Sequence, residues 1–244
     1  MAVTSQTSSE NINTFLSHIK DEHKVALSVD CVIFGYMTGE LKVLLLECNM
    51  PPFVGQYSLV GDLIQSCETL EESALKILKQ RTGITDLYLK QVGTFSSIDR
   101  HPLGRVISTA YYTIIKENDY APRESDNSLK VVWKSIDKIE DLAFDHNVIL
   151  KKSLETLRWR VRNKPFGMKL LPKKFTLKEL QALYEAVLGI ELDKRNFRRK
   201  LKNSNLLVAH KESQQDVKHR PAQFYSFNLE SYNRQMASET VIGI

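Results

Sequence analysis

The clearest chemical signal in the sequence is a dense basic run near its C-terminal end. Residues 193–202 contain six Lys or Arg side chains and one Asn. In the major groove of DNA, Arg and Lys can pair with guanine and Asn with adenine, while the remaining cations neutralise phosphates. A charge run by itself is also typical of a solvated helix face. The candidate DNA contacts in this run are Lys194, Arg195, Asn196, Arg198, Arg199, Lys200 and Lys202.

The elements predicted around this basic run favour DNA binding over a solvated helix face. Thr176-Leu-Lys-Glu179 has the form of a capping box and predicts a helix that ends at Gly189. Asp193 can cap a second helix over 194–202, only a few residues later. The two apolar side chains of that helix are four residues apart, so they share one face and leave the basic side chains exposed. This spacing is typical of a helix-turn-helix.

Two strands are predicted after the second helix, over 206–209 and 222–227. The polar loop between them carries Lys218 and Arg220. Such a loop can lie along the DNA backbone or enter a minor groove, so both residues are further candidate contacts. The order helix, turn, helix, hairpin is that of a winged helix and indicates double-stranded DNA as the partner. Docking to RNA or to another protein is the alternative.

Charge is distributed unevenly along the chain. Residues 1–163 hold 19 Lys and Arg against 21 Asp and Glu, whereas residues 164–244 hold 15 against 8. The basic excess therefore belongs to the C-terminal third. An almost neutral body with a small basic module indicates a polyanionic partner, with nucleic acid as the first candidate and an anionic membrane surface as the second.

Composition excludes several classes of protein. Of 244 residues, 42% are hydrophobic, which excludes a disordered chain and suffices for one large core or two modest ones. The three cysteines are odd in number and far apart, so neither a disulfide framework nor a zinc site is expected. No apolar run is long enough to span a bilayer, and residues 1–10 do not resemble a secretion signal. We therefore expect a cytoplasmic protein with no membrane partner and a flexible leader over residues 1–20.

The N-terminal part is predicted to mix one sheet with few helices. Strands are expected over 25–36, 41–47, 88–95, 106–115 and 131–133. A capping box at Thr69 predicts a helix that ends near Gly83. A longer helix is expected from about Asp145 to Arg162, followed over 163–174 by an interdomain linker that can itself be partly packed. The apolar stripe predicted for that helix is Val148, Leu150, Leu154, Leu157 and Val161.

The segment 57–84 resembles a Nudix box, whose pattern is G-x5-E-x7-R-E-U-x-E-E-x-G-U. Glu68, Gly83 and Ile84 match the pattern, and Lys76 stands at the position of its Arg. Asp62 stands at the first Gly, while Ile77, Gln80 and Arg81 replace three Glu residues. Nudix hydrolases use those carboxylates to hold divalent cations that polarise a pyrophosphate. The resemblance therefore implies a Nudix-like domain that is not an enzyme, with no catalytic residue, metal or cofactor, in which the remaining glutamates favour a helix N-terminus.

A Nudix-like domain, the segments 93–112 and 142–146 and a winged helix together resemble the Nudix-related transcriptional regulators. The resemblance implies an α+β protein with an N-terminal Nudix-like α/β/α sandwich and mixed sheet over 21–163, and a C-terminal winged helix-turn-helix over 164–244. It also implies a homodimer on an operator, with the Nudix-like domain sensing a small molecule. The branch that regulates L-arabinose utilisation looks nearest, so we expect a repressor that senses a pentose such as L-arabinose or xylose. ADP-ribose, in a regulator of NAD metabolism, is the alternative effector.

Such a sensor needs polar groups for several hydroxyls and an apolar face for a ring. Asp30 interrupts an apolar strand, where a carboxylate is costly unless it is paired, so it either binds a buried Arg or faces a pocket. Asp145 can instead cap the helix that follows it. Tyr111 and Tyr112 alternate across a strand, so at most one faces the pocket. The candidate effector contacts are Asp30, Asp99, Arg100, Asp145 and His146.

Two other functions compete with the regulator. A divergent Nudix hydrolase of ADP-ribose or a related compound would use the basic module as an accessory, and Ile77, Gln80 and Arg81 argue against it. An RNA-binding or scaffold protein would bind tightly without preferring an operator sequence.

Overall fold

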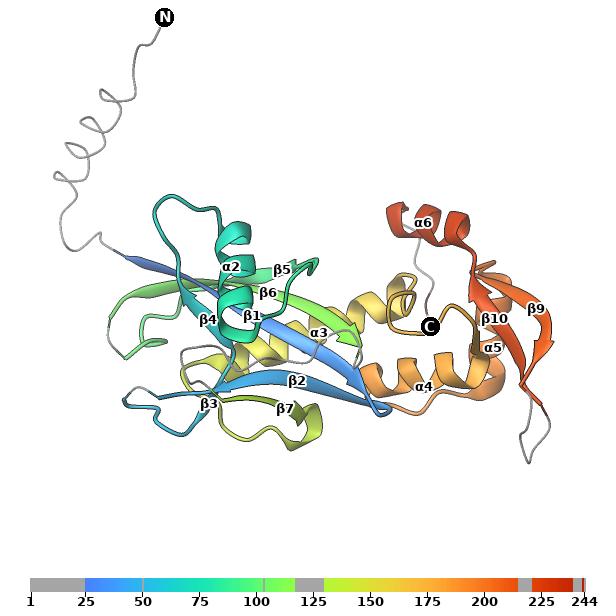
Figure 1. Cartoon of the computed structure of the whole chain (residues 1–244), viewed down its shortest axis with the longest axis horizontal. Helices are drawn as coiled ribbons and strands as arrows, with labels where there is room; N and C mark the ends of the chain where they lie inside the picture. The colour runs from blue at the N-terminus through green and yellow to red at the C-terminus, as the bar shows by residue number, and fades with distance from the viewer. Residues whose placement is uncertain are drawn as a thin grey trace, which may run out of the picture.

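The structure is a computed structural model that describes residues 25–49, 51–102, 104–116, 130–214, 221–238 and 243. One seven-stranded mixed sheet forms the N-terminal part, and a three-stranded sheet with helices forms the C-terminal part (Figure 1). The expected α+β class, with a Nudix-like sandwich followed by a winged helix, is confirmed. None of the helices in the described ranges is both long enough and apolar enough to cross a membrane.

The long first strand is the centre of the N-terminal sheet. Strand β1 (Ala26–Met37) turns through Thr38 and Gly39 into the antiparallel β2 (Glu40–Glu47), and both turn residues have positive φ, as a type I′ hairpin turn requires. Strand β1 also pairs in parallel with β6 (Val106–Lys116) and antiparallel with β4 (Val60–Leu63). The remaining strands are β3 (Tyr57–Ser58) and β7 (Val131–Ser135), which pair with β2, and β5 (Lys90–Phe95), which pairs with β6.

Helices cover both faces of this sheet. Helix α2 (Leu70–Thr82) packs on one face, where Val29, Cys31 and Ile33 of β1 join its Ile77 and Leu78 in one apolar cluster. The alternate residues of β1 point to the other face, against α3 (His146–Asn163) and the winged helix. Helix α2 begins and ends as the sequence predicts, with a complete capping box at Thr69 and a left-handed Gly83.

The predicted apolar stripe of α3 needs one correction. Val148 is 59% exposed, and Ile149 is buried in its place. The buried residues include a row with four-residue spacing, from Ile149 through Ser153 and Leu157 to Val161. The rest of the predicted stripe is correct, because Leu150, Leu157 and Val161 are buried and Leu154 packs against the core. Ser153 fits there because its hydroxyl donates a hydrogen bond to the carbonyl of Ile149.

The C-terminal part has the predicted winged-helix order with two further elements. The predicted elements are α4 (Leu177–Leu188), α5 (Lys194–Asn203), β9 (Leu207–Ser213) and β10 (Gln223–Phe227). Two elements were not predicted: β8 (Phe175–Thr176), which pairs with β10, and α6 (Leu229–Ala237). In the N-terminal part, a short 3-10 helix, η3 (Ile136–Lys138), follows β7. Helix α6 packs back toward the segment after α3, where the Tyr232 hydroxyl donates to the Pro165 carbonyl.

The segment predicted as a linker is packed into the core. Phe166, Leu170 and Leu171 are buried in a single apolar cluster that also holds residues of β1, β2, α3, α4 and α5. Arg158 of α3 donates from Nε to the carbonyl of Val187 near the end of α4, at 3.1 Å. Helix α3 therefore runs from the N-terminal sheet directly against the winged helix (Figure 1).

Candidate ligand pocket and nucleic-acid interface

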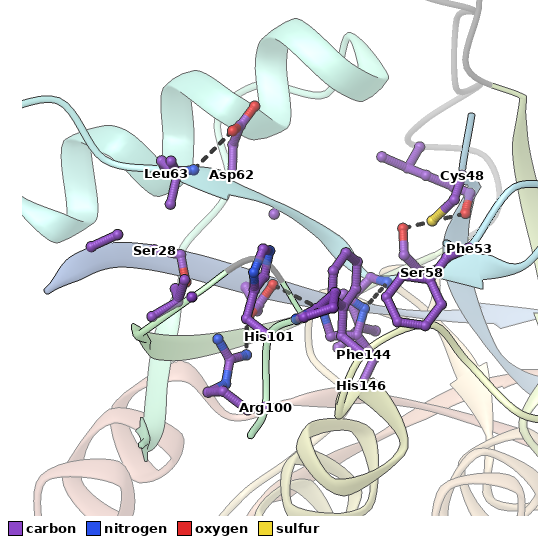
Figure 2. A pocket seen from close by; sticks show the side chains of 18 of the residues that line it. Ser28, Cys48, Phe53, Ser58, Asp62, Leu63, Arg100, His101, Phe144 and His146 are labelled. Carbon is purple, nitrogen blue, oxygen red and sulfur yellow. Dashed lines mark hydrogen bonds and ion pairs between the residues drawn. The ribbon is translucent and has the colours of Figure 1, made fainter. Parts of the chain in front are cut away.

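A cavity of about 550 Å³ opens beside β1 and β4. Its walls come from both strands and from the loops after β2, before β6 and before α3 (Figure 2). This volume is within the range of small-molecule binding sites. Three of the predicted effector residues, Asp30, Arg100 and His146, line it.

Asp30 forms the polar floor of the pocket. Its Oδ2 accepts hydrogen bonds from Ser108 Oγ at 2.5 Å and from Arg100 Nη2 at 3.3 Å. Its Oδ1 lies 3.3 Å from His146 Nε2. The sequence left two readings open for Asp30, and the structure shows both, because this buried carboxylate binds a buried Arg and also lines the cavity.

Arg100 connects this floor to the start of α3. Its Nε and Nη2 donate to the two oxygens of Asp145, at 3.0 and 2.8 Å. The guanidinium therefore binds two carboxylates at once while its side chain is only 3% exposed. Asp145 occupies the N-cap position of α3 but makes no side-chain cap, so the capping role expected for it is wrong. Pairing with Arg100 takes up both of its oxygens instead.

Hydrogen bonds fix the proton positions around Asp30. The backbone N–H of Leu59 donates to His146 Nδ1 at 2.9 Å, which leaves His146 Nε2 as the nitrogen that donates toward Asp30. Burial raises the pKa of the Asp30 carboxyl, but the interactions with His146, Ser108 and Arg100 outweigh burial and lower that pKa below its ordinary value. Asp30 is therefore an ionised carboxylate at neutral pH.

Aromatic rings form another wall of the pocket, which the sequence analysis missed. The ring of Phe144 stacks on His101 with centroids 5.1 Å apart, and it contacts Phe53 at 4.5 Å (Figure 2). Phe144 holds a positive φ of 58°, which is rare for a large side chain. Burial, followed by the charge of Arg100, lowers the pKa of His101 and favours its neutral form. A neutral aromatic wall suits the flat face of a heterocycle.

The other two predicted effector residues, Asp99 and Asp145, do not line the cavity. Asp99 is exposed and does not line it, although its neighbour Arg100 does. Tyr111 packs under α2, where its hydroxyl donates to Glu71, and Tyr112 packs in the core on the opposite face. Neither tyrosine lines the pocket, which agrees with core packing as their default role.

The glutamates near the start of α2 have structural partners. Glu68 accepts from Ser73 and Lys76, Glu71 from Tyr111, and Glu72 completes the capping box with Thr69. Ile77 is buried in the core. Among the residues that the structure describes, no group of three His, Cys, Asp or Glu is placed to hold a metal ion. The donor set therefore does not fit the divalent cations that Nudix hydrolases hold.

Arg81 and Asp62 meet at the edge of the pocket. Asp62 on β4 forms an ion pair with Arg81 on the last turn of α2, and both residues line the cavity. These are two of the positions at which the sequence departs from the Nudix pattern. A cation and an anion thus face each other where that pattern has a Glu and a Gly.

Gly61 allows the close approach of β4 to Asp30. A Cβ atom added at Gly61 would lie 2.3 Å from Asp30 Oδ1 and 2.7 Å from the Val29 carbonyl. We expect Gly61→Ala to lower the free energy of unfolding by about 1–3 kcal/mol, because the backbone oxygen cannot move away easily. Urea unfolding monitored by Trp fluorescence would measure the loss, with the exposed Gln65→Ala as a control that changes stability by less than about 0.5 kcal/mol. Equal stability of Gly61→Ala and the parent protein would show that β4 adjusts freely.

Helix α5 presents its basic side chains outward, as predicted. The Asp193 side chain caps the helix by accepting from the Asn196 N–H at 2.7 Å, and Phe197 and Leu201 are buried against α4. Asn196 and Lys200 are half-buried, and Asn196 accepts from Arg199 at 2.8 Å. Lys218 and Arg220 lie outside the described residues. The exposed cations of α5 are Lys194, Arg195, Arg198, Arg199 and Lys202.

Comparison with known proteins places this arrangement in context. The family model described as "NrtR DNA-binding winged helix domain" matches residues 167–227. Over 211 residues the chain is 32% identical to the "ADPR responsive transcriptional repressor NtrR" of Acinetobacter baylyi, an alignment that covers 85% of this chain and 84% of that protein.

Two solved structures of Shewanella oneidensis NrtR are also similar. The crystal structure with a 27mer DNA is 27% identical, with a TM-score of 0.70, and the match covers 85% of this chain and 95% of that one. The structure of the NUDIX domain with ADP ribose is also 27% identical, with a TM-score of 0.53, over 59% of this chain and 97% of that one.

Proposed function

The chain belongs to the family of Nudix-type transcriptional regulators that includes the ADPR responsive transcriptional repressor NtrR, and on this basis we propose that it is a DNA-binding repressor that senses ADP-ribose. The observation that carries the proposal is the likeness to that relative over 85% of this chain, which is long enough to include both the sensor and the winged helix. In the proposal, α5 enters the major groove of an operator, and two copies of the chain form a homodimer on adjacent half-sites.

The pocket supports ADP-ribose over a pentose as the effector. The expectation of L-arabinose or xylose receives no support from the comparisons, which favour the alternative effector instead. A cavity of about 550 Å³ is large for a single sugar ring, and its aromatic wall of Phe53, Phe144 and His101 suits an adenine. The carboxylate of Asp30 can accept hydrogen bonds from ribose hydroxyls.

Helix α3 is the proposed connection between effector and DNA. His146 at its start lines the pocket, Asp145 before it binds the pocket residue Arg100, and Arg158 near its end donates to the Val187 carbonyl near the end of α4. Eighteen helical residues span about 27 Å, so one rigid element reaches from the sensor to the DNA-binding part. The effector can shift DNA affinity only by the difference in its own affinity for the two arrangements of the protein.

We expect ADP-ribose to weaken operator binding by about 5- to 150-fold, the usual range for coupled sites. Fluorescence anisotropy with labelled DNA from upstream of the gene and its neighbouring operons would measure the affinity, with ADP-ribose, L-arabinose or xylose added in parallel. Release by either pentose and not by ADP-ribose would overturn the proposed effector. Binding that ignores DNA sequence would overturn the repressor and favour a scaffold, and magnesium-dependent turnover of ADP-ribose that is lost in Glu68→Gln would favour a hydrolase.

A further inference from the structure

The pocket must supply positive charge if its ligand carries a diphosphate. Divalent cations usually neutralise such groups, and they require several oxygen ligands close together. The carboxylates at and just before the start of α2 are bonded to Ser73, Lys76, Tyr111 and the helix N-terminus, and no metal-binding group of side chains is present in the described part of the chain. A side chain therefore has to provide the charge.

Arg81 is the cation best placed for this role. Arg100 is buried and already bonded to Asp30 and Asp145, so a ligand would have to break a buried pair to use it. Arg105 also lines the cavity, but its Nη1 donates to the carbonyls of Ser96 and Ser97 at 2.7 and 3.0 Å. Among the residues that the structure describes, Arg81 binds Asp62 alone, in a half-exposed ion pair.

We propose that the Arg81 guanidinium binds the diphosphate of the effector in place of a divalent cation, and that Asp62 competes with the diphosphate for it. The inference rests on the proposed function and adds to it a metal-independent mode of binding. A planar guanidinium donates two parallel hydrogen bonds to phosphate oxygens, which gives both charge and orientation. An exposed ion pair contributes little stability, so the diphosphate can displace Asp62 without disturbing the fold.

If Asp62 and the diphosphate compete for Arg81, replacing Arg81 and replacing Asp62 should change the affinity for ADP-ribose in opposite directions. Arg81→Gln removes the cation, and we expect it to weaken ADP-ribose binding by at least ~10-fold, the loss typical of a charged hydrogen-bond partner. Asp62→Asn removes the competitor, and we expect it to tighten binding several-fold. A merely structural ion pair would give the same sign for both variants, because each would disturb the same pocket edge.

Isothermal titration of the full chain with ADP-ribose, in EDTA and then in excess magnesium, tests the proposal. We expect equal affinity in the two buffers, the two opposite shifts described above, and no change for Lys79→Gln, an exposed cation of the same helix that does not line the cavity. Adenosine, which lacks phosphate, should bind the parent protein and Arg81→Gln equally.

The possible failures are distinct from one another. Binding that disappears in EDTA, or an Arg81→Gln variant with unchanged affinity for ADP-ribose, would overturn the inference while leaving the ADP-ribose sensor intact. Weaker binding by both Arg81→Gln and Asp62→Asn would also overturn it. Failure of the parent protein to bind ADP-ribose in either buffer would overturn the proposed function itself.

Discussion

Replacing Arg195 and Arg199 together with alanine is expected to reduce operator affinity by at least ~30-fold, because an Arg contact to a base edge contributes about 1–3 kcal/mol. Both side chains are exposed on α5, whose apolar residues fix the helix against α4. Arg199 also holds the side-chain carbonyl of Asn196, so its removal frees a second candidate base contact from its present orientation. The double variant should therefore lose both affinity and sequence preference.

Anisotropy titrations over a series of salt concentrations would separate this effect from a general loss of charge. If the two side chains contact phosphates, the slope of log affinity against log salt should become less steep by about two. Lys151→Ala with Lys152→Ala removes the same charge from the exposed surface of α3 and serves as the matched control. Unchanged affinity and slope in Arg195→Ala with Arg199→Ala would mean that α5 is not the DNA-reading helix.

Removing the Arg100 side chain should cause the largest loss of stability in the sensor. Arg100→Ala leaves Asp30 buried and Asp145 half-buried without their shared cation, and breaking a buried pair in this way costs about 3–5 kcal/mol. For a chain of this size, the melting temperature should fall by about 6–20 °C. Arg162→Ala, at an exposed position of α3, should change stability by less than about 0.5 kcal/mol.

The loss of stability caused by Arg100→Ala should become smaller as the pH falls. The pKa of Asp30 is lowered from its ordinary value of 3.8, so the stability that this carboxylate contributes is present above pH 3.8 and disappears as pH falls through the lowered pKa. A protonated Asp30 no longer needs the guanidinium, so the difference between the parent protein and Arg100→Ala should shrink toward low pH. Thermal melts from pH 7 to pH 3 would measure it, and a difference that grew as pH fell would contradict the assigned ion pair.

Local signals explain why much of the fold was predictable. The capping boxes at Thr69 and Thr176 and the left-handed glycines Gly83 and Gly189 act within one helical turn, and each lies where the sequence predicts. The predicted stripe of α3 was wrong only at Val148, because Val148 and Ile149 are both apolar and only the packing of the folded chain shows which of them is buried. Strand β8 is only two residues long and exists because β10 pairs with it, which no local pattern reveals.

The pocket was only partly predictable for a similar reason. Asp30 is conspicuous because a carboxylate in an apolar strand needs partners. Phe53, His101 and Phe144 come from three loops that are distant in sequence, and only the folded chain brings their rings together. Their types give no signal, since single aromatic residues in loops are common. The segment 142–146 contributed to the family resemblance, but the resemblance did not assign Phe144 to the pocket wall.

The single apolar core that joins β1, β2, α3 and α4 has a thermodynamic consequence. Because the sensor and the DNA-binding part bury surface against each other, each part stabilises the other, and we expect the chain to lose its structure in one cooperative transition. A ligand that binds only the native state stabilises everything that unfolds with its site. The effector would therefore protect the winged helix from unfolding even while it lowers the affinity of that helix for DNA.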